Sequence, residues 1–171
     1  MLLATSQPAF AQPSRAAPRI AGRPAAGLVA GFVMALMAGA ASAQMSPEGV
    51  WHSIDDATGK PKAEIKISQG PAGELSGVVV RGLDPAPSAE PNCVKCTDDR
   101  KDKPKIGMEI IRGGKKAEGR DVWDGGRILD PENGKDYSLR LTPIDGGKKL
   151  EVRGYIGSPL LGRTQTWIRA Q

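Results

Sequence analysis

The chain has 171 residues and a formal net charge of +5, from 24 Lys and Arg residues and 19 Asp and Glu residues. Three of the basic residues and none of the acidic ones precede Ala43, so the remaining chain has 21 basic and 19 acidic residues. This near balance argues against a nucleic-acid-binding protein, which presents a strongly basic surface. We therefore expect no nucleic-acid partner.

The first 43 residues have the order of a secretory signal peptide. Its basic region, apolar run and small-residue cleavage site are Arg15, Arg19 and Arg23, then Gly27–Ala40, then Ala41–Ala43. The apolar run is shorter than the roughly 20 residues that a membrane-spanning helix needs. We therefore predict cleavage after Ala43, a periplasmic or secreted location, no transmembrane span after processing, and one mature domain at residues 44–171.

The mature chain predicts short strands separated by turns. Apolar and polar residues alternate strictly in Ala63–Gln69, Tyr137–Leu141 and Leu150–Ile156, which is typical of half-buried antiparallel strands. In chain order the predicted strands are Val50–Ile54, Ala63–Gln69, Leu75–Arg81, Ile106–Arg112, Arg120–Trp123, Arg127–Asp130, Tyr137–Leu141, Leu150–Ile156 and Arg163–Arg169. Eight or nine strands without crossover helices predict an all-β fold, a small antiparallel up-and-down barrel.

One long segment, Gly82–Lys105, interrupts this pattern and contains both cysteines, Cys93 and Cys96. We interpret it as a flap at one end of the barrel. In an exported protein the two cysteines are expected to form a structural disulfide. The alternative is a redox-active pair, but such a pair usually begins a helix, and no helical periodicity follows Cys96. A metal site would need two further soft ligands, so we expect no metal and no cofactor.

Enzyme motifs are weak in this sequence. The glycine-rich run Gly154–Gly162 differs from a phosphate loop, because the alternating segment Arg163–Arg169 that follows predicts a strand instead of a helix. The mature chain has a single histidine, His52, and no nucleophile elbow, which argues against a hydrolytic triad. We therefore predict a protein without catalytic residues.

The first and last predicted strands carry a motif of lipocalin-like barrels. There, a Gly-x-Trp in the first strand packs against an arginine of the last strand. Gly49 and Trp51 supply the first part, and Arg163 or Arg169 supplies the arginine, with Trp167 in the same strand. A cation–π contact between the indole and the guanidinium would close one end of the barrel.

Four segments together resemble a known family. They are GVWHSIDDATGKPKAEIKI, CVKCTDDRKDKPKIGMEII, WDGGRILDPENGKDYSLRL and LEVRGYIGSPLLGRTQTWIR. They are similar, in order, to the bacterial exported domain of unknown function 2147, over Pro47 to Arg169. The resemblance implies a lipocalin-type barrel. It implies no activity, catalytic residue or ligand.

Two classes of function remain after these observations. The first is a monomeric binding protein that takes a small lipophilic molecule at the barrel mouth, where we expect Asp130, Arg153 and Tyr155 to face the ligand. The second is an envelope structural or interaction protein with a filled barrel. A disulfide-exchange protein that uses Cys93 and Cys96 is the third interpretation.

Overall fold

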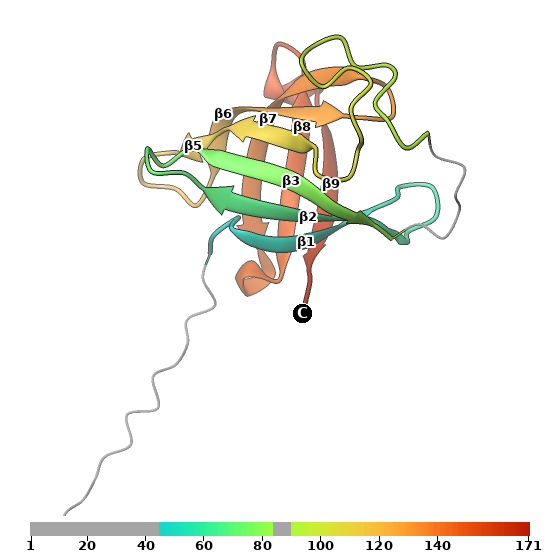
Figure 1. Cartoon of the computed structure of the whole chain (residues 1–171). Coiled ribbons are helices and arrows are strands. Elements are labelled where there is room, and N and C mark those ends of the chain that lie inside the picture. The colour runs from blue at the N-terminus through green and yellow to red at the C-terminus, as the bar shows by residue number, and fades with distance from the viewer. Residues whose placement is uncertain (1–44, 84–89) are drawn as a thin grey trace, which may run out of the picture. The chain divides into compact units, whose positions relative to one another are not determined.

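The computed structural model describes residues 45–83 and 90–171 of the chain (Figure 1). The predicted signal peptide, residues 1–43, therefore lies outside the described residues. Within the described part, no helix has the length and apolar character needed to cross a membrane.

Nine strands and two short 3-10 helices make up the described fold. In chain order they are β1 (Gly49–Ile54), β2 (Pro61–Gln69), β3 (Leu75–Gly82), β4 (Glu109–Gly113), β5 (Lys115–Lys116), β6 (Trp123–Asp130), β7 (Lys135–Ile144), η1 (Asp145–Gly147), β8 (Lys149–Tyr155), η2 (Pro159–Leu161) and β9 (Arg163–Arg169).

Eight of these strands form a closed barrel in which sequence neighbours are sheet neighbours. The hydrogen-bonded order is β4-β3-β2-β1-β9-β8-β7-β6-β5, and an additional antiparallel pairing between β4 and β6 closes the sheet. The two-residue strand β5 pairs with the start of β6 and extends beyond the closed wall. The predicted all-β, antiparallel up-and-down barrel is therefore confirmed (Figure 1).

Residue alternation explains which side chains enter the barrel. In β2, Ile65 and Ile67 are buried while Lys66 between them is exposed. Leu139 and Leu141 repeat this arrangement in β7. Because successive side chains of a strand point to opposite faces, the period-two pattern of the sequence gives the inward set directly.

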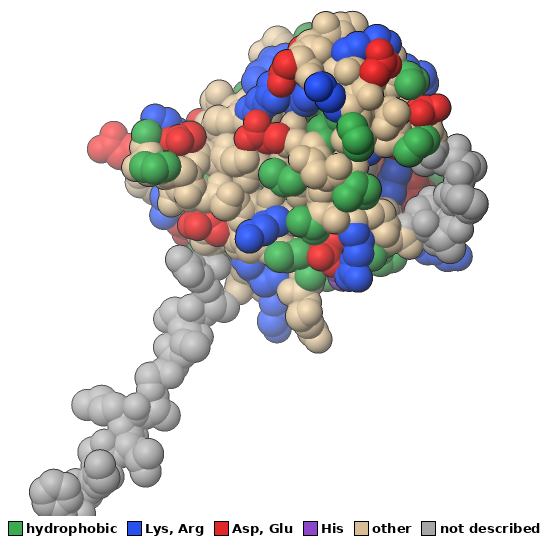
Figure 2. All heavy atoms as spheres, in the orientation of Figure 1, with side chains coloured by type: hydrophobic (Ala, Val, Ile, Leu, Met, Phe, Trp, Pro, Cys, Tyr) green, Lys and Arg blue, Asp and Glu red, His purple; other side chains and the backbone are tan. Residues whose placement is uncertain are grey.

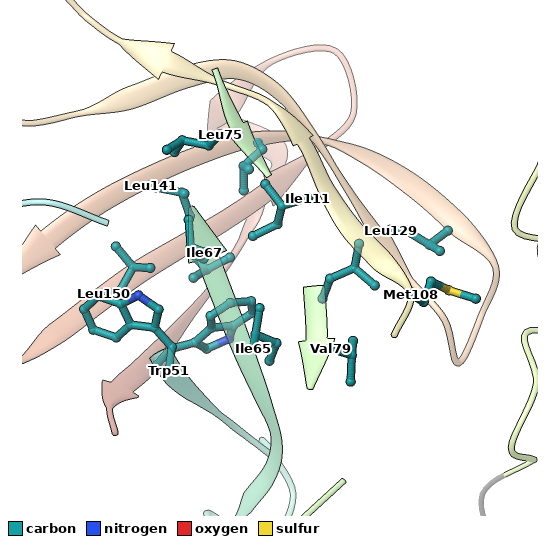
Figure 3. Packing of buried hydrophobic residues seen from close by; sticks show 14 of the residues in the cluster. Trp51, Ile65, Ile67, Leu75, Val79, Met108, Ile111, Leu129, Leu141 and Leu150 are labelled. Atoms are coloured by element: carbon teal, nitrogen blue, oxygen red, sulfur yellow. The ribbon is translucent and has the colours of Figure 1, made fainter. Parts of the chain in front are cut away.

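The interior is filled mainly by branched aliphatic residues and tryptophan. Trp51, Trp123 and Trp167 are all buried, and they belong to one continuous apolar cluster. Figure 3 shows Trp51 beside Ile65 and Leu150 in this cluster. Burial of this apolar surface is the main source of the barrel's stability.

The predicted strands differ from the structure most clearly at β6. The separate strands Arg120–Trp123 and Arg127–Asp130 are wrong, because β6 runs unbroken from Trp123 to Asp130. Its register shifts between Asp124 and Gly126, and the intervening Gly125 has a positive φ of 74°. This bulge interrupts the alternation, so a single strand has the sequence pattern of two.

The two ends of the barrel are distinct. At the base end lie the start of β1, the end of β9, the β2–β3 turn and η1. At the rim end lie the β1–β2 loop, the long β3–β4 connection, the β6–β7 turn and the β8–β9 connection with η2.

Candidate functional site

The base end is closed by an arginine stacked on a tryptophan. The guanidinium carbon of Arg169 lies 4.1 Å from the centroid of the Trp51 ring. The Trp51 indole Nε1 donates a hydrogen bond to the Pro47 carbonyl at 2.8 Å. These contacts join the lead-in segment, β1 and β9 into one buried seal.

Arg169 also satisfies three backbone carbonyls around this seal. It donates to Gly147 at 2.6 Å, to Glu48 at 2.8 Å and to Ser46 at 2.9 Å. A side chain at Gly49 would collide with the Arg169 guanidinium, and its φ of 125° also favours glycine. The glycine of the Gly-x-Trp motif thus leaves room for the arginine.

The other candidate arginine, Arg163, lies at the opposite end of β9. It forms an ion pair with Asp56 of the β1–β2 loop at the rim end. Trp167 lies inside the barrel beyond the seal, where its Nε1 donates to Gln165 Oε1 at 3.3 Å. Of the two arginines, Arg169 is therefore the one that contacts Trp51.

At the rim end, the inward-facing residues are only half-buried. We call them the rim ring: Ser53, Ala63, Ile128, Tyr137, Gly154 and Gln165. Ala63 and Ile128 pack against the apolar cluster below. A Cβ placed on Gly154 would lie 3.5 Å from Tyr137 and 3.8 Å from Ile128, which places these three side by side on the inner wall.

The rim ring combines an apolar lower surface with several hydrogen-bonding groups. The Gln165 amide nitrogen donates to Asp56 at 2.7 Å, and the Ser53 hydroxyl donates to the Ala63 carbonyl at 3.3 Å. The Tyr137 hydroxyl accepts a hydrogen bond from Asn133 at 3.2 Å. An apolar surface with a few polar groups at its edge is the usual composition of a small-molecule site.

The disulfide-containing loop lies at the same end but against the outside of the wall. Cys93 and Cys96 are joined by a disulfide, and both are buried. Ile110 and Leu129 neighbour the inward residues Ile111 and Ile128 in sequence, so alternation turns them outward. They are nevertheless buried in the same cluster as the two cysteines.

Charged groups hold this loop to the outer wall. The Arg112 guanidinium of β4 binds Asp99 with two hydrogen bonds of 2.7 and 2.8 Å, which lowers the Asp99 pKa to about 2. Arg100, only 5% exposed, donates to Asp136 of β7 at 3.1 Å and to the Glu109 carbonyl at 3.2 Å. Figure 2 shows acidic and basic side chains intermixed over this part of the surface.

An open depression of about 340 Å³ lies between the loop and the start of β4. Its lining is Asp99, Arg100, Lys103, Pro104, Ile106, Gly107, Met108 and Glu109. Among the residues that the structure describes, no group of three or more His, Cys, Asp and Glu side chains is placed to hold a metal ion. Arg100 of the depression is paired with Asp98 and Asp136, and the carboxylates of Asp99 and Glu109 are paired with Arg112. These ion pairs fasten the loop to the outer wall.

Comparison with known proteins identifies the family. Residues 49–169 match a family described as uncharacterized proteins conserved in bacteria, DUF2147. The chain belongs to the DUF2147 family. This confirms the resemblance seen in the four sequence segments.

One solved structure extends the comparison to the fold. It is similar to this DUF2147 chain with a TM-score of 0.61 and 17% sequence identity, over 72% of this chain and 82% of the other. That protein is HP1028 from the human pathogen Helicobacter pylori, described as belonging to the lipocalin family. The DUF2147 barrel is thus lipocalin-like in fold. The chain matches no curated protein.

The structure does not bring the three predicted mouth residues of the DUF2147 barrel together inside it. Arg153 and Tyr155 alternate with the inward Val152 and Gly154, so both lie on the outer wall. Asp130 ends β6 and uses its carboxylate to accept hydrogen bonds within the following turn. Their charge or aromatic ring favoured them as ligand-facing residues in the sequence. The alternation of the strands instead turns their neighbours in the chain into the barrel.

Four members of the rim ring, Ser53, Ala63, Gly154 and Gln165, are small or polar, so apolar patterning alone does not mark them as inward residues. The alternation of each strand could have identified them. Every second residue of β2 points inward, and one further step beyond Ile65 reaches Ala63; in β8 one step beyond Val152 reaches Gly154. The burial of Cys93 and Cys96 separates them from solvent and argues against a disulfide-exchange role for this DUF2147 protein.

Proposed function

We propose that this DUF2147 protein is an exported, non-catalytic binding barrel that holds a small lipophilic molecule at its rim end. The observation that carries the proposal is the change in burial along the interior. Inward residues are fully buried toward the base, at Trp51 and Trp167, and only half-buried in the rim ring. The signal-peptide pattern of residues 1–43 supports export to the periplasm or beyond.

The chemistry of the rim ring supports an elongated molecule with one polar end. Its apolar part would contact Ala63 and Ile128, above the buried tryptophans. Its polar part would meet the Gln165 amide and the Tyr137 hydroxyl at the edge. Binding of this kind needs no nucleophile or proton-transfer pair. The lipocalin-like fold supports the proposal by analogy of architecture, while the residues of the rim ring supply the chemical argument.

A specific observation favours a second candidate, the structural or interaction protein with a filled barrel. Trp51, Trp123 and Trp167 occupy the interior together with close-packed aliphatic residues. Such packing leaves the lower part of the barrel as a solid core. The two candidates differ in whether anything occupies the space above the rim ring.

The experiment that separates them analyses what the purified protein carries. The native protein is denatured, the extract is examined by mass spectrometry, and uptake of a fluorescent fatty acid is measured by Trp emission. Ala63→Phe places a large ring in the rim ring, whereas Ser68→Phe places the same ring on the outer face of β2 as a matched control.

The binding proposal expects a near-stoichiometric apolar molecule, or probe uptake, in the wild type and in Ser68→Phe, with at least about a tenfold loss in Ala63→Phe. An empty extract with no probe uptake would favour the filled barrel. Uptake that Ala63→Phe leaves unchanged would move the ligand site away from the rim ring.

A further inference from the structure

The β8–β9 connection exposes large apolar side chains at the rim end. Leu160 and Leu161, both in η2, are 89% and 82% exposed, and Ile156 is 66% exposed. Single apolar residues on a surface are ordinary, but two adjacent leucines held almost wholly in water indicate a contact surface. We propose that this tip, residues 156–162, inserts into the surface of a membrane that contains anionic lipids.

The tip is held in shape by its own hydrogen bonds. The Ser158 hydroxyl accepts from the Leu160 amide at 3.3 Å, and the Ser158 carbonyl accepts from the Leu161 amide at 3.0 Å. Arg153 of β8 donates to the Pro159 carbonyl at 2.7 Å. The leucines are therefore presented outward by a fixed turn, and insertion orders little additional chain.

The charges around the tip complement an anionic membrane. No residue from 156 to 162 is charged, while Arg153 and Arg163 flank the segment. Arg163 is paired with Asp56, whereas Arg153 has no acidic partner among the described residues and supplies the net positive charge beside the tip. Arg153 also donates to Thr164, which keeps its guanidinium beside the tip. Apolar residues that enter the boundary between headgroups and acyl chains, with cations at the headgroup level, are the pattern of interfacial membrane binding.

The size and position of the tip favour a membrane over a second protein chain. A stable protein interface buries about 800 Å² per partner, far more than three side chains on one turn provide. A membrane requires only that the tip enter its surface layer. The tip joins the strands that carry Gly154 and Gln165, so docking would turn the rim ring toward the lipid. The inference does not depend on the rim ring holding a ligand.

The test measures vesicle binding of residues 44–171, the predicted mature chain, which includes every strand of the described fold. Flotation uses vesicles of phosphatidylcholine alone and of phosphatidylcholine with phosphatidylglycerol. The wild type is expected to float with the anionic vesicles. Leu160→Ser combined with Leu161→Ser should lower the partition coefficient of the protein at least about tenfold, because each leucine side chain that leaves water for the membrane contributes strongly to binding.

Two further variants serve as controls. Ile168→Ser replaces a 38% exposed apolar residue of β9 toward the base end and should change partitioning less than twofold. Arg163→Gln leaves the Asp56 carboxylate at the rim end without its cation and should lower binding to anionic vesicles roughly fivefold. Added salt should reduce the difference between the two vesicle types. Circular dichroism of each variant checks that the strand content is unchanged.

Three outcomes would overturn the proposal. The first is a wild-type protein that floats with neither kind of vesicle. The second is a double-serine variant that partitions like the wild type. The third is a leucine-dependent dimer in analytical ultracentrifugation without vesicle binding, which would assign the tip to a second copy of the chain.

Discussion

Arg169 covers the face of Trp51 and closes the base of the barrel. Its guanidinium carbon lies 4.1 Å from the ring centroid, and its nitrogens donate to carbonyls of the lead-in segment and of η1. One side chain therefore joins three parts of the chain that are far apart in sequence. The Arg169 guanidinium lies over an aromatic face and its N–H groups donate to carbonyls. These contacts offset the free-energy cost of removing the charge from water.

Removal of either member of this pair should destabilise the protein. Trp51→Ala is expected to cost about 3–5 kcal/mol, as for large aromatic residues in cores. Arg169→Ala should cost about 2–4 kcal/mol, because it loses the stacking and leaves backbone carbonyls without a donor. Arg163→Ala, which breaks an exposed ion pair, should cost less than about 1 kcal/mol. Urea unfolding followed by Trp fluorescence measures all three. A Trp51→Ala cost below about 1 kcal/mol would contradict the role of this seal.

Gly134 should be intolerant of any side chain. Its φ is 73°, and a Cβ there would collide with the Lys95 carbonyl of the disulfide-containing loop. Gly59 has a similar φ of 69° and open space around it. Gly59→Ala should therefore show the backbone cost alone, about 1–2 kcal/mol. Gly134→Ala should exceed it by at least about 2 kcal/mol. Equal losses in thermal unfolding would show that the loop moves away without cost.

The disulfide should stabilise the loop more than the barrel. The short loop between Cys93 and Cys96 limits the entropic contribution to about 2 kcal/mol, and both residues also fill buried volume. Replacement of both by alanine should cost about 2–4 kcal/mol and leave the strand content intact. Replacement by serine should cost more, because two hydroxyls enter the apolar cluster. Circular dichroism and chemical unfolding provide the comparison.

The same burial predicts slow reduction of the native disulfide. With glutathione present, alkylation of Cys93 and Cys96 should be rapid in urea and slow in buffer, as read by mass spectrometry. Rapid native reduction together with insulin-reductase activity would instead support a redox role.

Acid should weaken the attachment of the loop between about pH 4 and pH 2. Hydrogen bonds from Arg112 lower the pKa of Asp99 from 3.8 to about 2 in the folded protein. The unfolded state therefore binds this proton more readily. The contribution of Asp99 to stability is complete above its unfolded pKa and is lost as the pH falls through the folded value.

Melting temperatures measured from pH 5 to pH 2 test this linkage. The wild type should lose stability more steeply below pH 4 than Asp99→Asn, which lacks the titrating group. Glu118→Gln, in the turn between β5 and β6, serves as the control for a general change of charge and should follow the wild type. Parallel curves for wild type and Asp99→Asn would show that the ion pair with Arg112 does not contribute.

The barrel was predictable because its strands alternate cleanly. Ala63–Gln69 and Leu150–Tyr155 show the inward set in the sequence itself, and turn residues mark the boundaries. The bulge at Gly125 and the two-residue β5 were not predictable, since both depend on contacts with other strands. Ile156 follows the apolar alternation, yet it lies beyond β8 and is exposed, because η2 turns the chain there.

The functional end was harder to predict, for a physical reason. Sequence patterns indicate which face of a strand is apolar, but they do not give the depth of a residue along the barrel axis. Ser53 and Gln165 are polar and inward, so only their alternation with Trp51 and Trp167 reveals them. The outer packing of the disulfide-containing loop depends on Ile110 and Leu129, which alternation alone would place in solvent.

The seal of the base also determines when the barrel can be completed during folding. Arg169 contacts carbonyls that precede it by 121 and 123 residues along the chain. A chain that emerges from its N-terminus can pair β1 with β2 and β3 early, but β1 keeps an unpaired edge until β9 arrives. Contacts of such sequence separation slow folding. Pairing of β9 with β1 and docking of Arg169 are therefore expected to complete the barrel. Until β9 has been synthesised, the preceding strands form an open sheet.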